Sequence, residues 1–499
     1  MTTPVVDAVA THARVNPEAL ACVDLESEQR WTYCELDQTT NRVAGWLISR
    51  LGNASGKRVA TLARNRAEII ILYLACIRAG AVFVPLNWRL SPAESLQLIA
   101  DFTPDLFFYD LEFELTALDI DAWPLSELIP LTKSLEATPV KSRRAFDDTS
   151  LLLYTSGTSG KPKGVMVTEA NVFWSNVNFN LSNRVSAESV FLCDMPLFHT
   201  AGLLTNARAP LTAGGTLLVS NGFDATKTLS RLGNAEMGIT HYFSVPQMAQ
   251  MLWNHPDFTP EKLQGLQVYA TGGAPNPAAQ IERFVNAGIP MSDGFGMTES
   301  GSNFGMPVVD RQLLIDKAGS CGLPYLCLET RLVNSDGVQV EINEPGELWV
   351  RGPCISPGYW KQPELTRQAY CDGWFCTGDI ARKDEDGFFY IVDRKKDMFI
   401  SGGENVYPVE VEATLAQLDA IAEVAVVGVP DATWGEKGVA FIVPASAVDV
   451  ETLRLHCEGQ LAKYKIPKEF VLVESIPRTG SGKAIKPLLV EQAKQLEHS

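Results

Sequence analysis

The sequence predicts an α/β protein with mostly parallel sheets, because strand-like and helix-like runs alternate through its first half. Residues 58–62 and 81–85 are strand-like, and the run 67–77 between them has a helical pattern. Further short β-rich runs occupy 216–219 and 267–271, each flanked by helical patterns. Alternation of this kind is typical of parallel sheets covered by helices.

The second half of the chain has a different pattern. From about Gly346 it consists of short strands and turns, including an Asp386-Gly387 turn. After Lys396, a predicted helix over 450–464 is accompanied by strand-like runs at 423–429, 439–443 and 469–473. One face of this helix carries apolar residues at helical spacing, namely Val450, Leu453, Cys457 and Leu461.

The length and the change of pattern together predict a division into domains. At 499 residues the chain is too long for one hydrophobic core. The pattern places a boundary at 394–397. We therefore expect an N-terminal domain of residues 1–395 and a C-terminal domain of residues 396–499, the second of ordinary domain size.

The bulk composition disfavours several classes of protein. A net charge of -17 argues against nonspecific binding to nucleic acid or to anionic membranes. The longest apolar stretch, 69–85, contains Arg78 and Gly80, so it predicts a buried helix followed by a strand and not a membrane span. The N-terminus lacks the pattern of a secretory signal, and the ten cysteines include no CxxC pair. We expect a cytoplasmic protein with reduced thiols.

The segment 154–164, YTSGTSGKPKG, has the composition of a polyphosphate-binding loop. Glycines allow backbone N–H groups to approach a ligand, hydroxyls donate hydrogen bonds and lysines supply positive charge. It is not a Walker A loop, because two residues separate Gly157 from Gly160 and Pro162 follows Lys161. A flexible linker has similar composition, but strand-like LLLY and VMV flank this segment. The candidate phosphate-binding residues are Thr155, Ser156, Gly157, Thr158, Ser159, Gly160, Lys161 and Lys163.

A second candidate segment is DGFGMTES, residues 293–300. Phe295, which precedes Gly296, can stack on a base, Thr298 can donate to a phosphate, and Glu299 can hold Mg²⁺ against phosphate oxygens. A buried phenylalanine in a turn is the alternative for this segment taken alone.

Three more polar residues are candidates for nucleotide contacts. Asp379 can accept two hydrogen bonds from a ribose diol or can cap a turn. Arg394 can contact a ribose or phosphate, whereas charged runs like 394–397 are also common on solvated surfaces. Lys483 lies in a Gly/Ser-rich loop that composition alone would assign to a frayed tail.

These segments, in this order and spacing, closely resemble the adenylate-forming superfamily of acyl-CoA synthetases, adenylation domains of peptide synthetases and luciferases. The resemblance extends from Trp31 to the loop that contains Lys483. It implies a large, multi-subdomain N-terminal domain with mostly parallel sheets and a β-barrel-like part, and a small, mobile α+β lid domain, with the active site between them. Members join a carboxylate to ATP, forming acyl-AMP and pyrophosphate, and most then transfer the acyl group to a thiol.

The resemblance also implies roles for individual residues. Lys483, Thr298, Glu299 and His199 are the expected catalytic residues, with Glu299 as the Mg²⁺ ligand and Lys396 as the hinge. The expected ATP site comprises the phosphate-loop residues with Gly273, Ala274, Phe295, Gly296, Thr298, Asp379, Arg394 and Lys483. Phe295 occupies a position where most members have tyrosine.

The acid and thiol sites follow from the same resemblance. The expected acyl pocket is formed by His199, Thr200, Ala201, Phe243, Gly272, Gly301 and Ser302. Amino-acid-activating members have an aspartate after the phenylalanine that here precedes His199, so an α-amino acid substrate is disfavoured. The expected CoA site contains Ser401, Gly402, Gly403 and Trp434, although a lone tryptophan can equally serve packing.

The sequence therefore predicts an acyl-CoA synthetase that uses ATP, Mg²⁺ and coenzyme A to activate a fatty or aromatic carboxylic acid. An acyl-AMP ligase that loads an acyl-carrier protein is the alternative, although fatty members of that class usually carry an insertion that is not apparent here. A luciferase-like oxygenase and a non-catalytic adenylate-binding protein are the remaining alternatives. We expect no nucleic-acid partner, and either a monomer or a homodimer.

Overall fold

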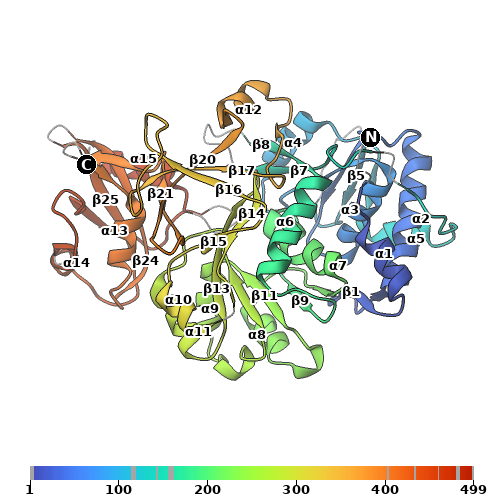
Figure 1. The fold of residues 1–499 in the computed structure, drawn as a ribbon, viewed down its shortest axis with the longest axis horizontal. Helices are drawn as coiled ribbons and strands as arrows, with labels where there is room; N and C mark the ends of the chain where they lie inside the picture. The colour runs from blue at the N-terminus through green and yellow to red at the C-terminus, as the bar shows by residue number, and fades with distance from the viewer. Residues whose placement is uncertain are drawn as a thin grey trace. The chain divides into compact units, whose positions relative to one another are not determined.

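The computed structural model describes residues 5–113, 120–141, 144–155, 162–308, 310–401, 404–431, 434–458, 460–478 and 484–496. The chain forms two compact units (Figure 1). The first comprises Met1–Glu329 with Arg351–Phe375, and the second comprises Thr330–Val350 with Cys376–Ser499. The predicted boundary at 394–397 falls inside the second unit, and the hinge at Lys396 stays a prediction.

The first sheet of unit 1 carries the predicted phosphate loop at one of its hairpins. Its central strands are parallel, whereas β7 and β8 are antiparallel and are joined across that loop. The strand order is β18 (Gly358–Tyr359), β8 (Lys163–Thr168), β7 (Thr149–Thr155), β4 (Val82–Pro85), β3 (Arg58–Leu62), β5 (Leu106–Tyr109) and β6 (Ala122–Pro124).

The second sheet of unit 1 is parallel from β13 to β1 and is extended by antiparallel strands at both edges. Its order is β15 (Leu323–Pro324), β14 (Gly301–Gly305), β13 (Met291–Met297), β12 (Val268–Thr271), β11 (His241–Ser244), β9 (Val190–Cys193), β10 (Thr216–Val219), β1 (Leu20–Asp24) and β2 (Arg30–Thr32). The parallel arrangement confirms the α/β prediction.

Helices connect and cover these strands (Figure 1). They are α1 (Ala8–Val15), α2 (Tyr33–Leu51), α3 (Ala67–Ala79), α4 (Pro92–Phe102), α5 (Leu128–Thr132), α6 (Glu169–Ser182), α7 (Ala209–Ala213), α8 (Ala225–Leu232), α9 (Pro246–Trp253), α10 (Ala278–Asn286), α11 (Arg311–Asp316) and α12 (Pro363–Ala369). Short 3₁₀ turns occupy Leu125–Glu127, Ala235–Met237 and Pro260–Lys262, and a π-helix, η2, spans Ala201–Arg208.

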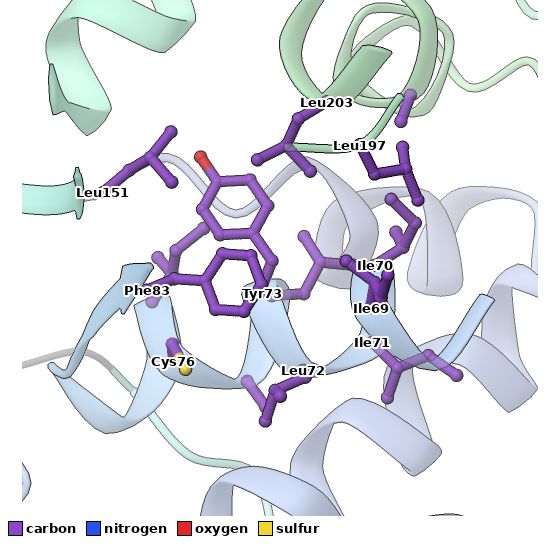
Figure 2. Close-up of a cluster of buried hydrophobic side chains, with 14 of the residues drawn as sticks. Ile69, Ile70, Ile71, Leu72, Tyr73, Cys76, Phe83, Leu151, Leu197 and Leu203 are labelled. Carbon is purple, nitrogen blue, oxygen red and sulfur yellow. The ribbon is translucent and has the colours of Figure 1, made fainter. Parts of the chain in front are cut away.

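Helix α3 lies at the centre of the main core (Figure 2). Every residue from Ala67 to Arg78 is buried, so the helix is covered on all sides and not on one face alone. Tyr73 stacks on Phe83 of β4, with ring centroids 5.4 Å apart. The helix ends at Gly80, whose φ of 81° is a left-handed conformation that glycine adopts at low cost. The predicted buried helix at 67–77 is thus confirmed.

Unit 2 contains most of a sheet with the order β16 (Glu329–Val333), β17 (Gly346–Arg351) and β20 (Trp374–Lys383), in which β21 (Phe389–Arg394) is antiparallel to β20. Strand β19 (Tyr370–Cys371) is antiparallel to the start of β20, and both of these stretches belong to unit 1. A second sheet in unit 2 has the order β23 (Glu404–Val406), β22 (Phe399–Ser401), β25 (Gly435–Pro444) and β24 (Ile421–Asp431), with β26 (Glu469–Leu472) parallel to β25. Its helices are α13 (Pro408–Leu415), α14 (Val450–Glu458) and α15 (Lys486–Leu496).

One prediction for unit 2 needs correction. Helix α14 ends at Glu458 and does not continue to residue 464. The sequence has a glycine at position 459, and glycine commonly follows the last residue of a helix. Leu453 and Cys457 are buried as expected, but Val450 lies at the start of the helix with 39% of its surface exposed.

Two further observations concern membrane-spanning segments and cysteines. Among the described residues, no helix combines the length and apolar character needed to cross a membrane. Each of the ten cysteines is described and is a free thiol.

Candidate functional site

The turn between β13 and β14 holds a buried carboxylate, Glu299, next to a lysine. Glu299 is 6% exposed. The Tyr359 hydroxyl donates to its Oε1 at 3.0 Å, and Lys163 Nζ lies 3.5 Å from the same oxygen. Lys163 Nζ also donates to Tyr359 Oη at 3.1 Å and lies 4.4 Å from the centre of that ring. The structure therefore brings together the predicted Mg²⁺ ligand and a lysine of the predicted phosphate loop.

Tyr359 was not predicted, although it completes this cluster. It lies 60 residues after Glu299 in the chain. The edge strand β18 pairs Tyr359 with Val165 of β8, which places its hydroxyl beside Lys163. A single tyrosine in a GYW sequence carries no local signal of this contact, so only the fold reveals it.

The residues of the cluster fit a magnesium ion that is bound partly by a protein carboxylate and partly by the phosphates of a nucleotide. Within the described ranges, no three His, Cys, Asp or Glu side chains converge to hold a metal by themselves. Mg²⁺ is commonly bound by one or two carboxylates together with substrate phosphates and water. Glu299 supplies such a carboxylate.

The phosphate loop closes the hairpin of β7 and β8. Thr155 at the end of β7 pairs with Lys163 at the start of β8. Thr155 Oγ1 is buried, and no described residue hydrogen-bonds to it. The predicted loop residues Ser156, Gly157, Thr158, Ser159, Gly160 and Lys161 lie outside the described residues.

The ends of β11, β12 and β13 bring together the residues predicted to contact adenine and the acid. A Cβ atom at Gly272 would lie 3.3 Å from Phe243 Cζ and 3.1 Å from the Gly294 carbonyl oxygen. Gly273, which precedes Ala274, has a φ of 82°. Phe295 meets Phe304 edge to face, with centroids 5.9 Å apart. Ligands commonly bind at the carboxyl ends of parallel strands, so this edge is a suitable place for a nucleotide.

Asp293, at the same edge, is a buried acid that was not predicted as a site residue. It is 8% exposed, and the Thr271 hydroxyl donates to its Oδ1 at 2.8 Å. Burial raises the pKa of Asp293 to about 8, and the hydrogen bond from Thr271 opposes that shift. Its position directly before Gly-Phe-Gly is the sequence signal that could have identified it.

Five of the seven predicted acyl-pocket residues come from two segments that meet beside α6. His199, Thr200 and Ala201 lead into η2, and Thr205 Oγ1 of η2 lies 3.4 Å from Ser302 Oγ. The backbone N–H of Ser302 donates to Ser175 Oγ of α6 at 3.0 Å. Helix α6, η2 and the start of β14 are therefore neighbours.

Gly301 and Gly296 lie where the chain leaves no room for a side chain. Gly301 has a φ of 64°, and a Cβ atom there would lie 2.6 Å from Ser175 Oγ. A similar restriction applies to Gly296, where a Cβ atom would lie 2.3 Å from the Gly301 carbonyl oxygen. Both glycines are thus needed for the tight turn that carries Thr298 and Glu299.

A buried ion pair fixes η2 against α6. Arg208, the last residue of η2, donates to Glu169 Oε2 at 3.1 Å, and Glu169 is 3% exposed. Glu169 Oε1 also accepts from the Tyr73 hydroxyl at 3.2 Å and from the Ser150 hydroxyl at 2.8 Å. Removing one partner of such a buried pair is strongly destabilising, so this network should hold the two elements in register.

In unit 2, the two residues predicted to contact the ribose form an ion pair. Asp379 of β20 lies opposite Arg394 of β21, and Arg394 Nε lies 2.7 Å from Asp379 Oδ1. Asp379 is 2% exposed, whereas the Arg394 side chain is 36% exposed. Lys396 follows this strand in a turn, and its side chain is exposed.

Two of the residues predicted for CoA, Ser401 and Trp434, lie on neighbouring parts of one sheet in unit 2. Ser401 of β22 pairs with Gly435, the neighbour of Trp434. Trp434 is 37% exposed, and Lys468 Nζ lies 4.6 Å from the centre of its ring. Gly402, Gly403 and the predicted catalytic Lys483 lie outside the described residues.

Models of two protein-family domains match this chain. The model of the AMP-binding enzyme family matches residues 9–360, and that of the AMP-binding enzyme C-terminal domain matches residues 410–483. A feruloyl-CoA synthase from Amycolatopsis sp is 38% identical over 481 residues, 95% of this chain and 96% of that protein. A long-chain-fatty-acid–CoA ligase from Mycobacterium tuberculosis is 34% identical over 492 residues, 96% of each protein.

Solved structures agree with these relatives. The o-succinylbenzoate CoA synthetase of Bacillus subtilis in complex with its acyl-adenylate intermediate has a TM-score of 0.88 and 30% identity, covering 98% of each chain. The same protein in complex with ATP and magnesium ion has a TM-score of 0.87 and 30% identity, covering 99% of this chain and 100% of that one.

Proposed function

Because the chain belongs to the AMP-binding enzyme family and is an ATP-dependent acid–CoA ligase, we propose a division of its two reaction steps among its residues. In the first step an oxygen of the acid attacks the α-phosphorus of ATP, and the bond to the β-phosphate breaks to release pyrophosphate. In the second step the CoA sulfur attacks the acyl carbonyl and AMP leaves. The acid is aromatic or fatty.

The cluster of Lys163, Tyr359 and Glu299 is the observation that carries this proposal. Adenylation brings two anions together, and preorganised charges at the reacting phosphate are the main means of lowering such a barrier. Mg²⁺, when bound, supplies charge neutralisation at the phosphates, and Glu299 would hold it. Lys163 places a positive charge beside Glu299, and Tyr359 keeps both side chains in position.

The remaining roles rest on position and chemistry. We assign Phe295 to stacking on adenine, Thr298 to a phosphate, and Asp379 with Arg394 to the ribose. Lys483 is assigned to the α-phosphate and the attacking carboxylate. His199 is assigned to the acyl pocket, and Trp434 to stacking on the nucleotide of CoA. Free thiols and the use of ATP and CoA support a cytoplasmic location.

A panel of carboxylic acids, scored for AMP and pyrophosphate, tests the proposal. Each acid is incubated with ATP and Mg²⁺ alone, with CoA, or with a phosphopantetheine-bearing acyl-carrier protein. We expect rapid AMP release with an aromatic or fatty acid only when CoA is present. AMP release that needs the carrier protein and ignores CoA would instead identify an acyl-AMP ligase.

A further inference from the structure

We infer that Asn65 is a positioning residue for the acid, because its amide fixes the turn that carries His199 and Thr200 into the proposed acyl pocket. This inference rests on the proposed function, which places those two residues in that pocket. Asn65 is 5% exposed. Its amide nitrogen donates to the Met195 carbonyl oxygen at 2.8 Å, and the backbone N–H of Leu197 donates to its amide oxygen at 2.9 Å.

These two hydrogen bonds attach one side chain to both sides of Pro196. A single bond would let the turn rotate about it, whereas the donor and the acceptor of one planar amide fix both its position and its orientation. Asn65 follows β3 of the first sheet and Met195 follows β9 of the second, 130 residues later. The amide therefore joins the two sheets of unit 1 at the turn before His199.

The segment that carries Asn65 is itself fixed on both sides. The backbone N–H of Arg64 donates to Asp110 Oδ2, and that of Ala67 donates to Asp24 Oδ2, each at 2.9 Å. Asp110 follows β5 of the first sheet, whereas Asp24 belongs to β1 of the second. A side chain that its surroundings hold in place can in turn hold a functional group within the narrow tolerance that a reaction needs.

The turn that Asn65 fixes leads directly to the predicted pocket residues. The backbone N–H of His199 donates to the Pro196 carbonyl oxygen at 3.1 Å, and the rings of Phe198 and His199 have centroids 4.4 Å apart. Gly202 of η2 lies against the same carbonyl, because a Cβ atom there would be 2.1 Å from the Pro196 oxygen. A shift of Pro196 would therefore move His199 and the start of η2 together.

Exposure distinguishes the two parts of this turn. Met195, Leu197 and Phe198 are buried, whereas His199 and Thr200 are partly exposed. Asn65 thus acts on the acid through the buried backbone of the turn and not by touching the acid itself. Misplacing a group that contacts a substrate by about 1 Å can cost roughly 10²-fold in rate, so a small shift of the turn matters.

Asn65→Ala tests the inference because it removes both hydrogen bonds. We expect the KM for the acid to rise roughly 10-fold or more while the KM for ATP stays unchanged. Both values come from AMP release in the presence of CoA, with cinnamate, octanoate and the fastest acid of the panel. Asn65→Asp keeps the oxygen that accepts from Leu197 and loses the donor to Met195, so its KM for the acid should lie between the wild-type and alanine values. It also serves as the test variant if Asn65→Ala does not fold.

Asn41→Ala is the matched control. Asn41 is also 5% exposed, and its amide oxygen accepts from the backbone N–H of Val140, 99 residues away, at 3.1 Å. Val140 belongs to none of the predicted sites. Asn41→Ala should therefore lower the melting temperature, as Asn65→Ala should, and leave the KM for the acid unchanged.

Two kinetic results would overturn the inference. If Asn65→Ala behaves like Asn41→Ala, with a lower melting temperature and an unchanged KM for the acid, Asn65 is structural. If the KM for ATP rises as much as the KM for the acid, Asn65 has a general effect on the site and does not position the acid.

A spectrum of the His199 ring separates this inference from the proposed function. If no acid of the panel yields AMP, the proposed function fails, and the ¹H–¹³C NMR signal of the His199 ring in the full chain still tests Asn65. That signal is the one missing from His199→Gln, among the six histidines of the chain. A signal that moves in Asn65→Ala and not in Asn41→Ala supports the inference, whereas an unchanged signal in Asn65→Ala overturns it.

Discussion

Glu299 receives its two partners from distant parts of the chain, Lys163 and Tyr359. The carboxylate is therefore fixed in place before any ligand arrives. A fixed group needs no reorganisation at the moment of reaction, which is the condition under which electrostatic groups contribute most to catalysis.

Glu299→Gln should raise the Mg²⁺ concentration needed for adenylation and slow the reaction. Glutamine keeps the size of the side chain and an acceptor for Tyr359, but it removes the anionic oxygen that suits Mg²⁺. We expect the Mg²⁺ requirement to rise on the order of 10–100-fold. ATP–pyrophosphate exchange measured over a range of Mg²⁺ concentrations gives this value. Tyr359→Phe, which preserves the charge of Glu299, should have a smaller effect, and an unchanged titration in Glu299→Gln would make Glu299 structural.

The buried carboxyl group of Asp293 makes the free energy of unfolding depend on pH. Its folded-state pKa is raised to about 8 by burial, from an ordinary value of 3.8. Between these two values the unfolded chain has lost this proton while the folded chain retains it. The contribution of Asp293 to the free energy of unfolding is therefore largest below pH 4 and declines as the pH rises toward 8.

Asp293→Asn should remove this decline, because the amide does not titrate. The melting temperature of the variant, relative to wild type, should rise steadily between pH 5 and pH 8, as measured by differential scanning calorimetry. A constant difference between the two proteins across this range would show that Asp293 is ionised in the folded state.

For individual residues, the sequence predicts the site residues that lie in distinctive local motifs and misses those that do not. Glu299 and Lys163 stand within Gly- and Thr-rich segments whose composition suggests phosphate chemistry, and both meet in the structure. Asp379 and Arg394 were likewise predicted separately and form one ion pair. Tyr359 was missed, because its significance depends on which segments the fold brings together.

Among the elements, the strands were the most predictable. The run 216–219 is β10 and the run 58–62 is β3, with the predicted bounds. Alternation of apolar and turn residues specifies where a buried strand begins and ends. The π-helix η2 could not be predicted, because its hydrogen-bonding pattern has no side-chain periodicity that distinguishes it from an α-helix over eight residues.

Gly301 and Ser302 are adjacent residues of the proposed acyl pocket in the β13–β14 hairpin. We expect them to respond differently when a larger side chain replaces each one. Ser302→Leu should shift preference toward shorter acids, with roughly 1–3 kcal/mol of discrimination for each methylene excluded. Gly301→Leu should instead lower the melting temperature, because residue 301 has a left-handed backbone and its side chain would collide with Ser175. Chain-length profiles and melting curves of both variants distinguish these effects. A Ser302→Leu profile that overlays the wild type would place the pocket elsewhere.

For the whole molecule, we propose that rotation of the backbone at Lys396 separates the two half-reactions. In this proposal Lys483 contacts the α-phosphate and the attacking carboxylate during adenylation, whereas CoA must later reach the carbonyl carbon of that same acyl group. Hinges of this kind absorb large changes in φ and ψ at a few residues. The structure shows Lys396 in an exposed turn after β21, where such a change would disturb little packing.

Lys396→Pro should impair transfer to CoA more than adenylation. Proline fixes φ at about -65° and restricts the residue before it, so one of the two conformations is lost.

Lys483→Ala should have the opposite effect, with adenylation slowed on the order of 10²–10³ and transfer from supplied acyl-AMP largely intact. Single-turnover measurement of each half-reaction in Lys396→Pro and in Lys483→Ala tests both predictions. Equal loss in both half-reactions of Lys396→Pro, or no loss in either, would exclude Lys396 as the pivot.

In the acyl pocket proposed above, both the length and the composition of the π-helix η2 would affect the choice of acid. A π-turn closes its hydrogen bonds over one residue more than an α-turn. Deleting one residue from 201–208 would draw this stretch toward an α-helix and rotate Thr200 and His199 relative to Ser302. Inserting a residue would have the reverse effect. In that pocket, a one-residue insertion or deletion in this chain would change which acids are accepted while leaving the nucleotide site unaltered, so the length of this segment is as important to substrate choice as its side chains.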